Sequence, residues 1–308
     1  VYMGGGYCRN DPVRLVGVTR CLALTSILTV VLATGCESRT PESTTRDDSQ
    51  ELRIVTLAPH LAEMLFDVGA GELLVGVSAY TDYPPQALSL PVIGDAFMID
   101  QERLAVLQPD LVLAWQSGTP RHVADELINQ GYQVELIQTR GLRDVALALR
   151  RIGELTRRKE QANAVAERFL EELSELGAKF SGAEPIRVFY QVDKRPIYTI
   201  NGDHFVSELI DLCGGVNIFA DIGNLAPLVS VEAVLERNPE VLLASEDAQP
   251  DAFSEWLRWQ GLAANRYGNR FYMPAGEIGR ATTRLVQAGR TLCETLEDSR
   301  GNRDGATD

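Results

Sequence analysis

Apolar strands alternate with single helices in two stretches of this chain, separated by a long helical segment. The expected strands lie at residues 53–58, 73–78, 110–115 and 132–138, and then at 186–192, 241–245 and 271–273. Single helices between consecutive strands are typical of a parallel sheet covered by helices. The sequence therefore predicts an α/β fold with two similar lobes.

A short internal repeat supports two similar lobes. Residues 108–114 (QPDLVLA) are echoed by residues 238–244 (NPEVLLA). At both places a helix is expected to end at a polar residue, and a proline and an acid then lead into a buried strand.

The segment between the two halves predicts one long helix that joins the lobes. From Leu142 to Leu176 there is no proline, and Gly153 is the only glycine. Apolar residues recur there at the three-and-four spacing of a helix face. Over thirty residues would reach roughly 50 Å at 1.5 Å per residue. The predicted domains are an N-terminal lobe, a bridging helix, a C-terminal lobe and a disordered tail, at residues 52–141, 142–180, 181–298 and 299–308.

The first forty residues have the composition of an export signal. Three arginines, at positions 9, 14 and 20, precede a short apolar run at 21–33. This run is shorter than the ~20 apolar residues of a membrane-spanning helix, which favours a signal peptide at 1–35. An N-terminal anchor helix is the alternative.

Residues 32–36 (LATGC) resemble a bacterial lipobox, in which Cys36 becomes the lipidated N-terminus. Residues 36–51 are then a flexible tether, because they are almost entirely polar. The lipid would hold the protein at a membrane, with about 0.8 kcal/mol from each buried methylene. The sequence thus predicts a periplasmic, membrane-anchored lipoprotein.

Charge and missing motifs exclude several functions. The formal net charge of −14 argues against nucleic acid as a partner, because phosphate binding needs a basic surface. After the signal there is no nucleophile elbow, Walker loop, dinucleotide fingerprint or zinc-protease helix. We therefore predict a protein that is not an enzyme and has no cofactor.

The chain has three histidines, at positions 60, 122 and 204, each near the start of a helix that is expected at a ligand-binding edge. Together with Glu277 or Asp82 they would suit a metal site. No paired His-x-His spacing supports the metal, so unrelated polar residues in first turns are the favoured interpretation.

The five cysteines leave one pair after processing. Removal of the signal takes Cys8 and Cys21, and lipidation uses Cys36. Cys213 and Cys293 remain, and an even remainder in an oxidising compartment favours a disulfide. Two separate buried thiols are the alternative.

Four segments carry a family resemblance. They are residues 53–59 (RIVTLAP), 76–85 (GVSAYTDYPP), 108–115 (QPDLVLAW) and 213–219 (CGGVNIF). Together they resemble the periplasmic cobalamin-binding proteins of bacterial ABC importers, over residues 53–296. The resemblance implies a rigid two-lobed receptor that captures cobalamin or a related corrinoid between its lobes and delivers it to the importer permease. It also implies a disulfide between Cys213 and Cys293.

The resemblance also implies site residues. Tyr80 and Trp115 match aromatics that contact the corrin, Tyr198 falls where the second lobe carries an aromatic, and Arg280 matches a residue near the cleft. His60 is added because it lies at the predicted binding edge. Flat side chains suit a large, partly apolar disc. Burial of Tyr80 and Trp115 in the core is the alternative.

Some positions depart from the family pattern. Leu136 and Ala226 stand where the family cleft has tryptophans. For docking on the permease the family uses one acidic side chain per lobe, and Glu232 matches the one on the second lobe. The corresponding first-lobe place holds Arg121, so Asp125 or Glu126 would have to substitute.

Two other functions remain open. One is a haem or ferric-siderophore receptor of the same fold. The other is a surface lipoprotein that uses this fold for protein contacts or signalling.

Overall fold

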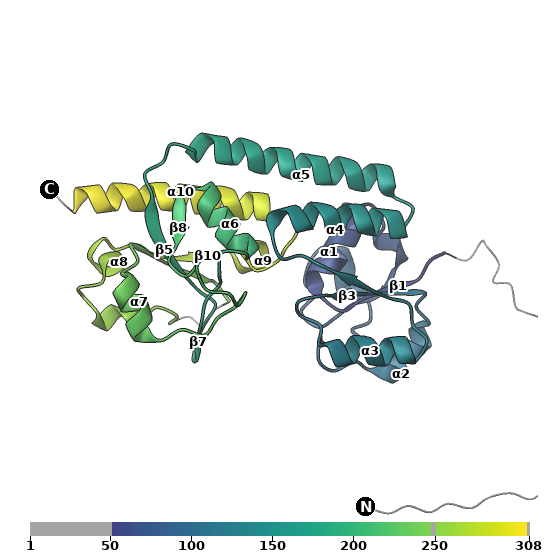
Figure 1. Ribbon diagram of the computed structural model, residues 1–308. Coiled ribbons are helices and arrows are strands. Elements are labelled where there is room, and N and C mark those ends of the chain that lie inside the picture. The colour runs from purple at the N-terminus through teal and green to yellow at the C-terminus, as the bar shows by residue number, and fades with distance from the viewer. Residues whose placement is uncertain (1–50, 248–250, 307–308) are drawn as a thin grey trace, which may run out of the picture. The chain divides into compact units, whose positions relative to one another are not determined.

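A computed structural model describes residues 51–247 and 251–306 of the chain. Residues 49–308 form one compact unit, in which two sheets lie in separate lobes below a layer of long helices (Figure 1). The predicted signal peptide, Cys36 and nearly all of the predicted tether lie outside the described residues. Within the described residues, no helix is both long and apolar enough to cross a membrane.

The first lobe is a four-stranded parallel sheet in the order β2-β1-β3-β4. Its strands are β1 (Ile54–Thr56), β2 (Leu74–Gly76), β3 (Leu111–Trp115) and β4 (Val134–Ile137). Its helices are α1 (Pro59–Asp67), α2 (Gln101–Leu107) and α3 (Arg121–Asn129), with short 3₁₀ turns at Gly71–Leu73 and Pro85–Ser89. All four strands lie at the predicted places, which confirms a parallel α/β lobe.

The second lobe repeats this plan in the order β10-β9-β5-β8, again all parallel. Its strands are β5 (Ile186–Gln191), β8 (Gly215–Asn217), β9 (Val241–Ser245) and β10 (Arg270–Met273). Its helices are α6 (Phe205–Leu212), α7 (Val231–Arg237), α8 (Ala263–Arg266), α9 (Ala275–Ile278) and α10 (Leu285–Gly305), with a 3₁₀ turn at Trp256–Arg258. A small antiparallel hairpin, β6 (Asp193–Lys194) and β7 (Ile197–Tyr198), follows β5. Neither β8 nor this hairpin was predicted from the sequence.

The internal repeat forms the same hydrogen bonds in both lobes. The backbone N–H of Arg53 donates to Asp110 Oδ2 at 2.9 Å, and that of Arg187 donates to Glu240 Oε2 at 3.0 Å. In each case the acid before one strand holds the start of the neighbouring strand. This shared pattern confirms that the two echoing segments are structurally equivalent.

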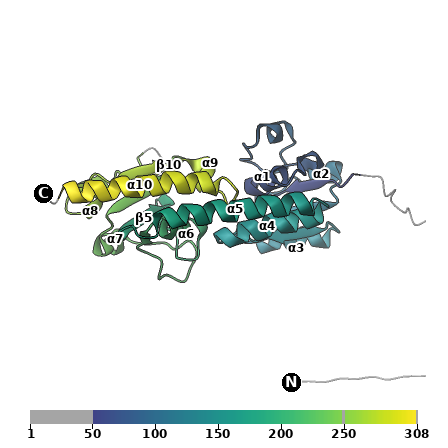
Figure 2. The same ribbon diagram turned by 90° about the horizontal axis from the view of Figure 1, so that it is seen from above.

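The prediction of one continuous helix over residues 142–180 is wrong. The segment forms two helices, α4 (Leu142–Leu155) and α5 (Lys159–Phe180), which pack on each other. The turn between them closes tightly because Gly153 has no side chain, and a Cβ there would overlap the side chain of Ala162. The three-and-four spacing of apolar residues does mark helix faces, but these are the buried faces of two helices that pack together. Helix α5 alone, with 22 residues and a length of about 33 Å, extends over both lobes (Figures 1 and 2).

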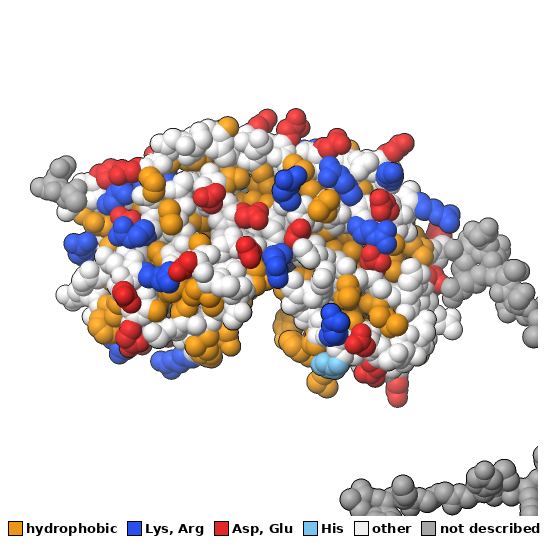
Figure 3. Space-filling model, viewed as in Figure 1, with side chains coloured by type: hydrophobic (Ala, Val, Ile, Leu, Met, Phe, Trp, Pro, Cys, Tyr) orange, Lys and Arg blue, Asp and Glu red, His pale blue; other side chains and the backbone are white. Residues whose placement is uncertain are grey.

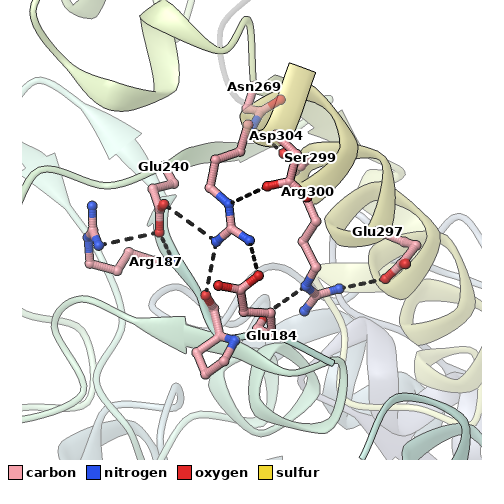
Figure 4. Close-up of polar contacts among 10 residues, drawn as sticks. Glu184, Arg187, Glu240, Asn269, Glu297, Ser299, Arg300 and Asp304 are labelled. Carbon is pink, nitrogen blue, oxygen red and sulfur yellow. Dashed lines mark hydrogen bonds and ion pairs between the residues drawn. The ribbon is translucent and has the colours of Figure 1, made fainter. Parts of the chain in front are cut away.

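The prediction of a disordered tail from residue 299 is also wrong, because α10 continues to Gly305. Arg300 extends from this helix towards the segment before β5, where it donates to the carbonyl of Glu184 at 2.7 Å (Figure 4). It also donates to the carbonyl of Cys213, at the end of α6, at 2.8 Å. Arg303 forms ion pairs with Glu184 and Glu240 at 2.6 and 3.7 Å. The polar residues for which a disordered tail was predicted are thus ordered by contacts with partners that are distant in sequence.

One cluster of buried apolar side chains runs through both lobes. It includes Leu61 and Leu113 of the first lobe, Phe169 of α5, and Leu209 and Leu285 of the second. This shared core fixes the lobes against the long helices, so the space between the sheets has a defined shape.

Candidate ligand-binding site

A cavity of about 320 Å³ lies between the two lobes. Its walls are loops and helix starts at the carboxyl ends of the parallel strands, where open α/β sheets bind ligands. In the space-filling view the cleft is an indentation between the lobes, with hydrophobic side chains on both sides (Figure 3). We call this space the cleft.

The first lobe contributes an aromatic wall to the cleft. Trp115 is the last residue of β3, and His60 lies in the first turn of α1. Their rings meet edge to face, with centroids 5.2 Å apart. The indole Nε1 atom is buried and has no hydrogen-bond partner within the part of the chain that the structure describes.

Tyr80 is presented to the cleft by an unusual backbone. Its φ angle is +65°, in the left-handed region that few non-glycine residues adopt, and its side chain is 83% exposed. The carbonyl of Tyr80 accepts a hydrogen bond at 3.0 Å from Nη2 of Arg280, which comes from the second lobe. The guanidinium therefore stabilises the loop conformation that leaves the aromatic ring open to a ligand.

Arg280 is the centre of a charged contact between the lobes. Its Nη1 atom donates to Glu63 Oε1 at 2.8 Å, and it also pairs with Asp82. Glu63 is only 2% exposed, and burial raises its pKa although the neighbouring guanidiniums oppose that shift. The hydrogen bond from Arg280 holds the pKa of Asp82 below its ordinary value. One cation thus pairs with two carboxylates of the other lobe, and Arg284 lies 3.9 Å from the second oxygen of Glu63.

Two further contacts extend this junction between the lobes. The hydroxyl of Thr283 donates to Asp67 Oδ2 at 2.9 Å, and burial raises the pKa of Asp67 to about 6. The guanidinium of Arg284 lies 4.4 Å from the centre of the Tyr83 ring. Because these groups come from different lobes, the junction fixes the width of the cleft on this side.

A family model described as periplasmic binding protein matches residues 54–276. The chain belongs to the periplasmic binding protein family. A vitamin B12-binding protein of Vibrio cholerae is 36% identical over 246 residues, which cover 80% of this chain and 89% of that protein. The crystal structure of the periplasmic vitamin B12 binding protein BtuF of Vibrio cholerae superimposes with a TM-score of 0.73 at 35% identity, covering 80% of this chain and 97% of that one.

The same fold occurs in receptors for other cargo. The periplasmic haem-binding protein BhuT has a TM-score of 0.73 but only 21% identity, over 81% of this chain and 99% of that one, so this likeness shows the fold alone. Membership of the periplasmic binding proteins confirms the prediction of a binding protein rather than an enzyme.

The structure brings most of the predicted site residues of this periplasmic binding protein together. His60, Tyr80, Trp115 and Arg280 all line the cleft. Tyr198 does not line it; this residue lies on β7 and is 36% exposed. Tyr198 lies on the unpredicted β6–β7 hairpin, and its carbonyl accepts a hydrogen bond from the backbone N–H of the lining residue Val192 at 2.9 Å.

The predicted alternative of a three-histidine metal site is wrong. His60 and His204 line the cleft, but His122 is exposed on α3 and does not. Burial and the charge of Arg280 lower the pKa of His60 to about 3, and burial lowers that of His204 to about 4. Both rings are therefore uncharged at neutral pH. No group of three metal-ligating side chains occurs in residues 51–247 and 251–306.

Several residues of the cleft were not predicted as ligand-binding. Tyr190 and Ile200 line it from β5 and the loop before α6, together with His204. The position of Tyr190 at the end of a predicted strand was a usable signal, because strand ends face the binding edge. The sequence held no such signal for Ile200, since its position depends on how the hairpin folds back.

Leu136 and Ala226, which stand where the family has tryptophans, do not line the cleft either. Leu136 is 45% exposed on β4, and Ala226 is exposed in the loop before α7.

Proposed function

We propose that this protein captures cobalamin or a related corrinoid in the cleft and delivers it to the permease of an ABC importer. The observation that carries the proposal is the meeting of Tyr80, Trp115 and His60 on one wall of a cleft closed by Arg280. The vitamin B12-binding relatives support the same cargo. A corrin is a flat, partly apolar ring edged with amides, and aromatic side chains bury such area at low entropic cost.

The charged groups of the cleft favour a ligand whose edge is uncharged. Arg280 is the only Lys or Arg among the described lining residues, and it is already paired with Glu63 and Asp82. Haem carries two carboxylates, which would lie near two protein carboxylates without a free cation. The amides of a corrin need hydrogen bonds but no counter-charge. This balance supports a corrinoid over haem.

Cobalamin is larger than the cavity, so it would also cover the exposed rim. Apolar side chains are exposed on both lobes near the cleft residues. They are Tyr80 at 83% and Tyr83 at 42% on the first lobe, and Val192 at 44%, Tyr198 at 36% and Leu228 at 59% on the second. We propose that Tyr198 contacts the part of the ligand that extends beyond the cavity.

The permease contact is proposed for one acid on each lobe. Glu232 is exposed in the first turn of α7, after the cap Ser230. The equivalent helix of the first lobe is α2, because both helices have seven residues, end in a left-handed residue and lead into the echoing strands. Its matching residue is Glu102, also exposed after an Asp100 cap. This equivalence favours Glu102 over Asp125 or Glu126, which lie on α3 (Figure 1).

The family supports the predicted periplasmic location. Signal cleavage after residue 35 and lipidation at Cys36 remain part of the proposal. The intact mass of the mature protein checks both, since an unmodified chain that begins elsewhere would contradict them.

Titration of the purified protein with cyanocobalamin and with haem tests the cargo. We expect quenching of tryptophan fluorescence by cyanocobalamin at submicromolar concentration, with an equimolar end point. Tight binding of haem, with a shifted Soret band and no response to cobalamin, would support the haem receptor instead. No response to either would leave the surface-lipoprotein function.

Replacing Trp115 with alanine is expected to weaken cobalamin binding by about 2 kcal/mol, roughly 30-fold, because a central aromatic anchor is lost. Isothermal calorimetry measures the change. Trp259, which is 38% exposed on the second lobe and does not line the cleft, provides a matched control. Equal affinity of the wild type and the Trp115→Ala variant would contradict the proposed wall.

Replacing Gly118 with alanine is expected to weaken binding without touching the ligand directly. A Cβ at Gly118 would overlap Cε3 and Cζ3 of the Trp115 ring, so the indole must move. We expect an affinity loss of about tenfold, since displacing a packed ring costs 1–3 kcal/mol. Gly182→Ala is the control, because a Cβ there meets nothing within 4 Å. Unchanged affinity and unchanged near-ultraviolet circular dichroism would show that the indole does not need its present position.

A further inference from the structure

His204 is held with one ring nitrogen turned to the protein backbone. It is the N-cap of α6, and its Nδ1 atom accepts a hydrogen bond from the backbone N–H of Val206 at 3.2 Å. A neutral imidazole has one N–H and one acceptor nitrogen. Because Nδ1 is the acceptor, the proton must lie on Nε2.

The ring remains in this tautomer across neutral pH. Burial lowers the pKa of His204 to about 4, so the ring carries no second proton. It stacks on Phe205, with centroids 4.2 Å apart and planes inclined by 35°, which fixes its orientation. The cap and the stacking together predetermine the direction of the Nε2–H bond.

This Nε2–H group is available to a ligand. His204 lines the cleft, and no hydrogen bond joins its Nε2 atom to any residue in the described part of the chain. A polar group in a partly buried wall is stabilised when a partner satisfies it. Water can accept from this N–H in the empty cleft, and an occupant that displaces the water has to supply an acceptor in its place.

The surroundings select an uncharged acceptor. Asp203 precedes His204, and Glu208 lies one helical turn later on α6. Glu208 is turned to α4, where its Oε2 atom accepts a hydrogen bond from the backbone N–H of Leu142. Arg280, the only cation among the described lining residues, is already paired with Glu63 and Asp82, so an anionic oxygen would find no free counter-charge, whereas a carbonyl oxygen needs none. Among the groups on the edge of a corrin, the amide carbonyl oxygens meet this requirement.

We propose that Nε2–H of His204 donates a hydrogen bond to an amide carbonyl oxygen on the corrin edge, which makes His204 a specificity-determining residue on the second lobe. The proposal rests on the proposed function. It adds a fixed polar contact opposite the aromatic wall of the first lobe, so that each lobe recognises a different property of the cargo.

The test variant is His204→Asn. Asparagine is a good N-cap, and its Oδ1 atom replaces Nδ1 as the acceptor for Val206, but its side chain is too short to replace Nε2–H. We expect the dissociation constant for cyanocobalamin to rise about five- to tenfold, as for one lost neutral hydrogen bond, with an almost unchanged Tm. His122→Asn is the matched control, because His122 is exposed and outside the cleft, and it should bind as the wild type does.

Cobinamide identifies the acceptor, because it keeps the corrin amides and lacks the nucleotide with its phosphate. Equal weakening of cobinamide and cobalamin binding by His204→Asn supports the amide. Weakening of cobalamin binding alone assigns the contact to the nucleotide and overturns the proposal. If the wild type binds cobalamin and His204→Asn binds it equally well, the proposal fails while the proposed function stands. If the wild type does not bind cobalamin, both fail.

Nitrogen-15 spectra of the histidine rings test the tautomer independently of affinity. We expect the signals of an Nε2–H ring for His204 in the free protein, and a shift of that N–H resonance when cyanocobalamin binds. An Nδ1–H ring, or an Nε2–H resonance that cyanocobalamin leaves unchanged, would overturn the inference.

Discussion

Replacing Arg280 with methionine is expected to lower the free energy of unfolding by about 2–3 kcal/mol at neutral pH, because the buried Glu63 carboxylate loses its closest cation and keeps only Arg284, at 3.9 Å. Glu63 is 2% exposed and Arg280 is 16% exposed, so water cannot replace the lost guanidinium. Chemical denaturation measures the change.

The loss of stability in the Arg280→Met variant should increase with pH. Burial already raises the pKa of Glu63 above its ordinary value, and the hydrogen bond and charge of Arg280 oppose that shift. Without Arg280 the pKa rises further, so the folded variant binds a proton over a wider pH range than the unfolded chain. Ionisation at higher pH then destabilises the variant more than the wild type. The difference between the two proteins should therefore grow as the pH rises above the ordinary range of a glutamate pKa.

Arg290 provides the matched control for this variant. Its ion pair with Glu172 spans 2.7 Å, but the two side chains are 51% and 35% exposed. Exposed pairs contribute about 0–1 kcal/mol, so Arg290→Met should change stability little at any pH. Equal effects of Arg280→Met and Arg290→Met would show that the junction between the lobes does not depend on a buried charge.

The same variant should bind cobalamin less tightly. The Tyr80 carbonyl loses its hydrogen bond from Nη2, and nothing then compensates for the left-handed backbone of that residue. We expect the Tyr80 loop to exchange hydrogen faster and the dissociation constant to rise about tenfold, which corresponds to 1.4 kcal/mol. Unchanged exchange in this loop would assign the affinity loss to direct contact between Arg280 and the ligand.

Removing the disulfide is expected to have a comparable effect on stability. Cys213 at the end of α6 is bonded to Cys293 in α10, across 80 residues of sequence, which confirms the predicted pairing. In the chain-entropy model a loop of this length contributes about 4–5 kcal/mol. The double variant Cys213→Ala/Cys293→Ala should lose about this free energy of unfolding, as measured by denaturant titration.

The reduced wild type separates the cross-link from the packing of the two side chains. Both cysteines are fully buried, so alanine also leaves a small void, whereas reduction keeps both sulfur atoms. Peptide mapping of the unreduced protein should find the peptides of Cys213 and Cys293 joined. Separate peptides, or a reduced wild type as stable as the oxidised one, would contradict this prediction.

Much of the fold was predictable because local patterns and tertiary structure agree. The strands at residues 111–115 and 241–245 are continuous apolar runs after a proline and an acid, and parallel strands buried on both faces require such runs. Tyr80 was predicted to be exposed because its neighbours have a loop composition, and it is. Where a segment is specified by its own residues, the sequence is sufficient.

The errors have a different origin. Apolar spacing from residue 142 to 176 fits one long helix and two packed helices equally well, and the choice depends on Gly153 meeting Ala162. The tail became helical because Arg300 finds carbonyl partners more than eighty residues away. Tyr198 missed the cavity because a hairpin with weak local signals positions it.

The sequence by itself determined the α/β plan, the repeat of two lobes, the remaining pair of cysteines and the aromatic residues of the first-lobe wall. Each of these follows from hydrophobic periodicity, turn chemistry, composition or residues that match a family. Only the tertiary structure decided that Arg280 bonds Glu63 and the Tyr80 carbonyl, and that Arg300 bonds the carbonyls of Glu184 and Cys213. Those features depend on hydrogen bonds and charges between segments far apart in the chain, which no local pattern encodes.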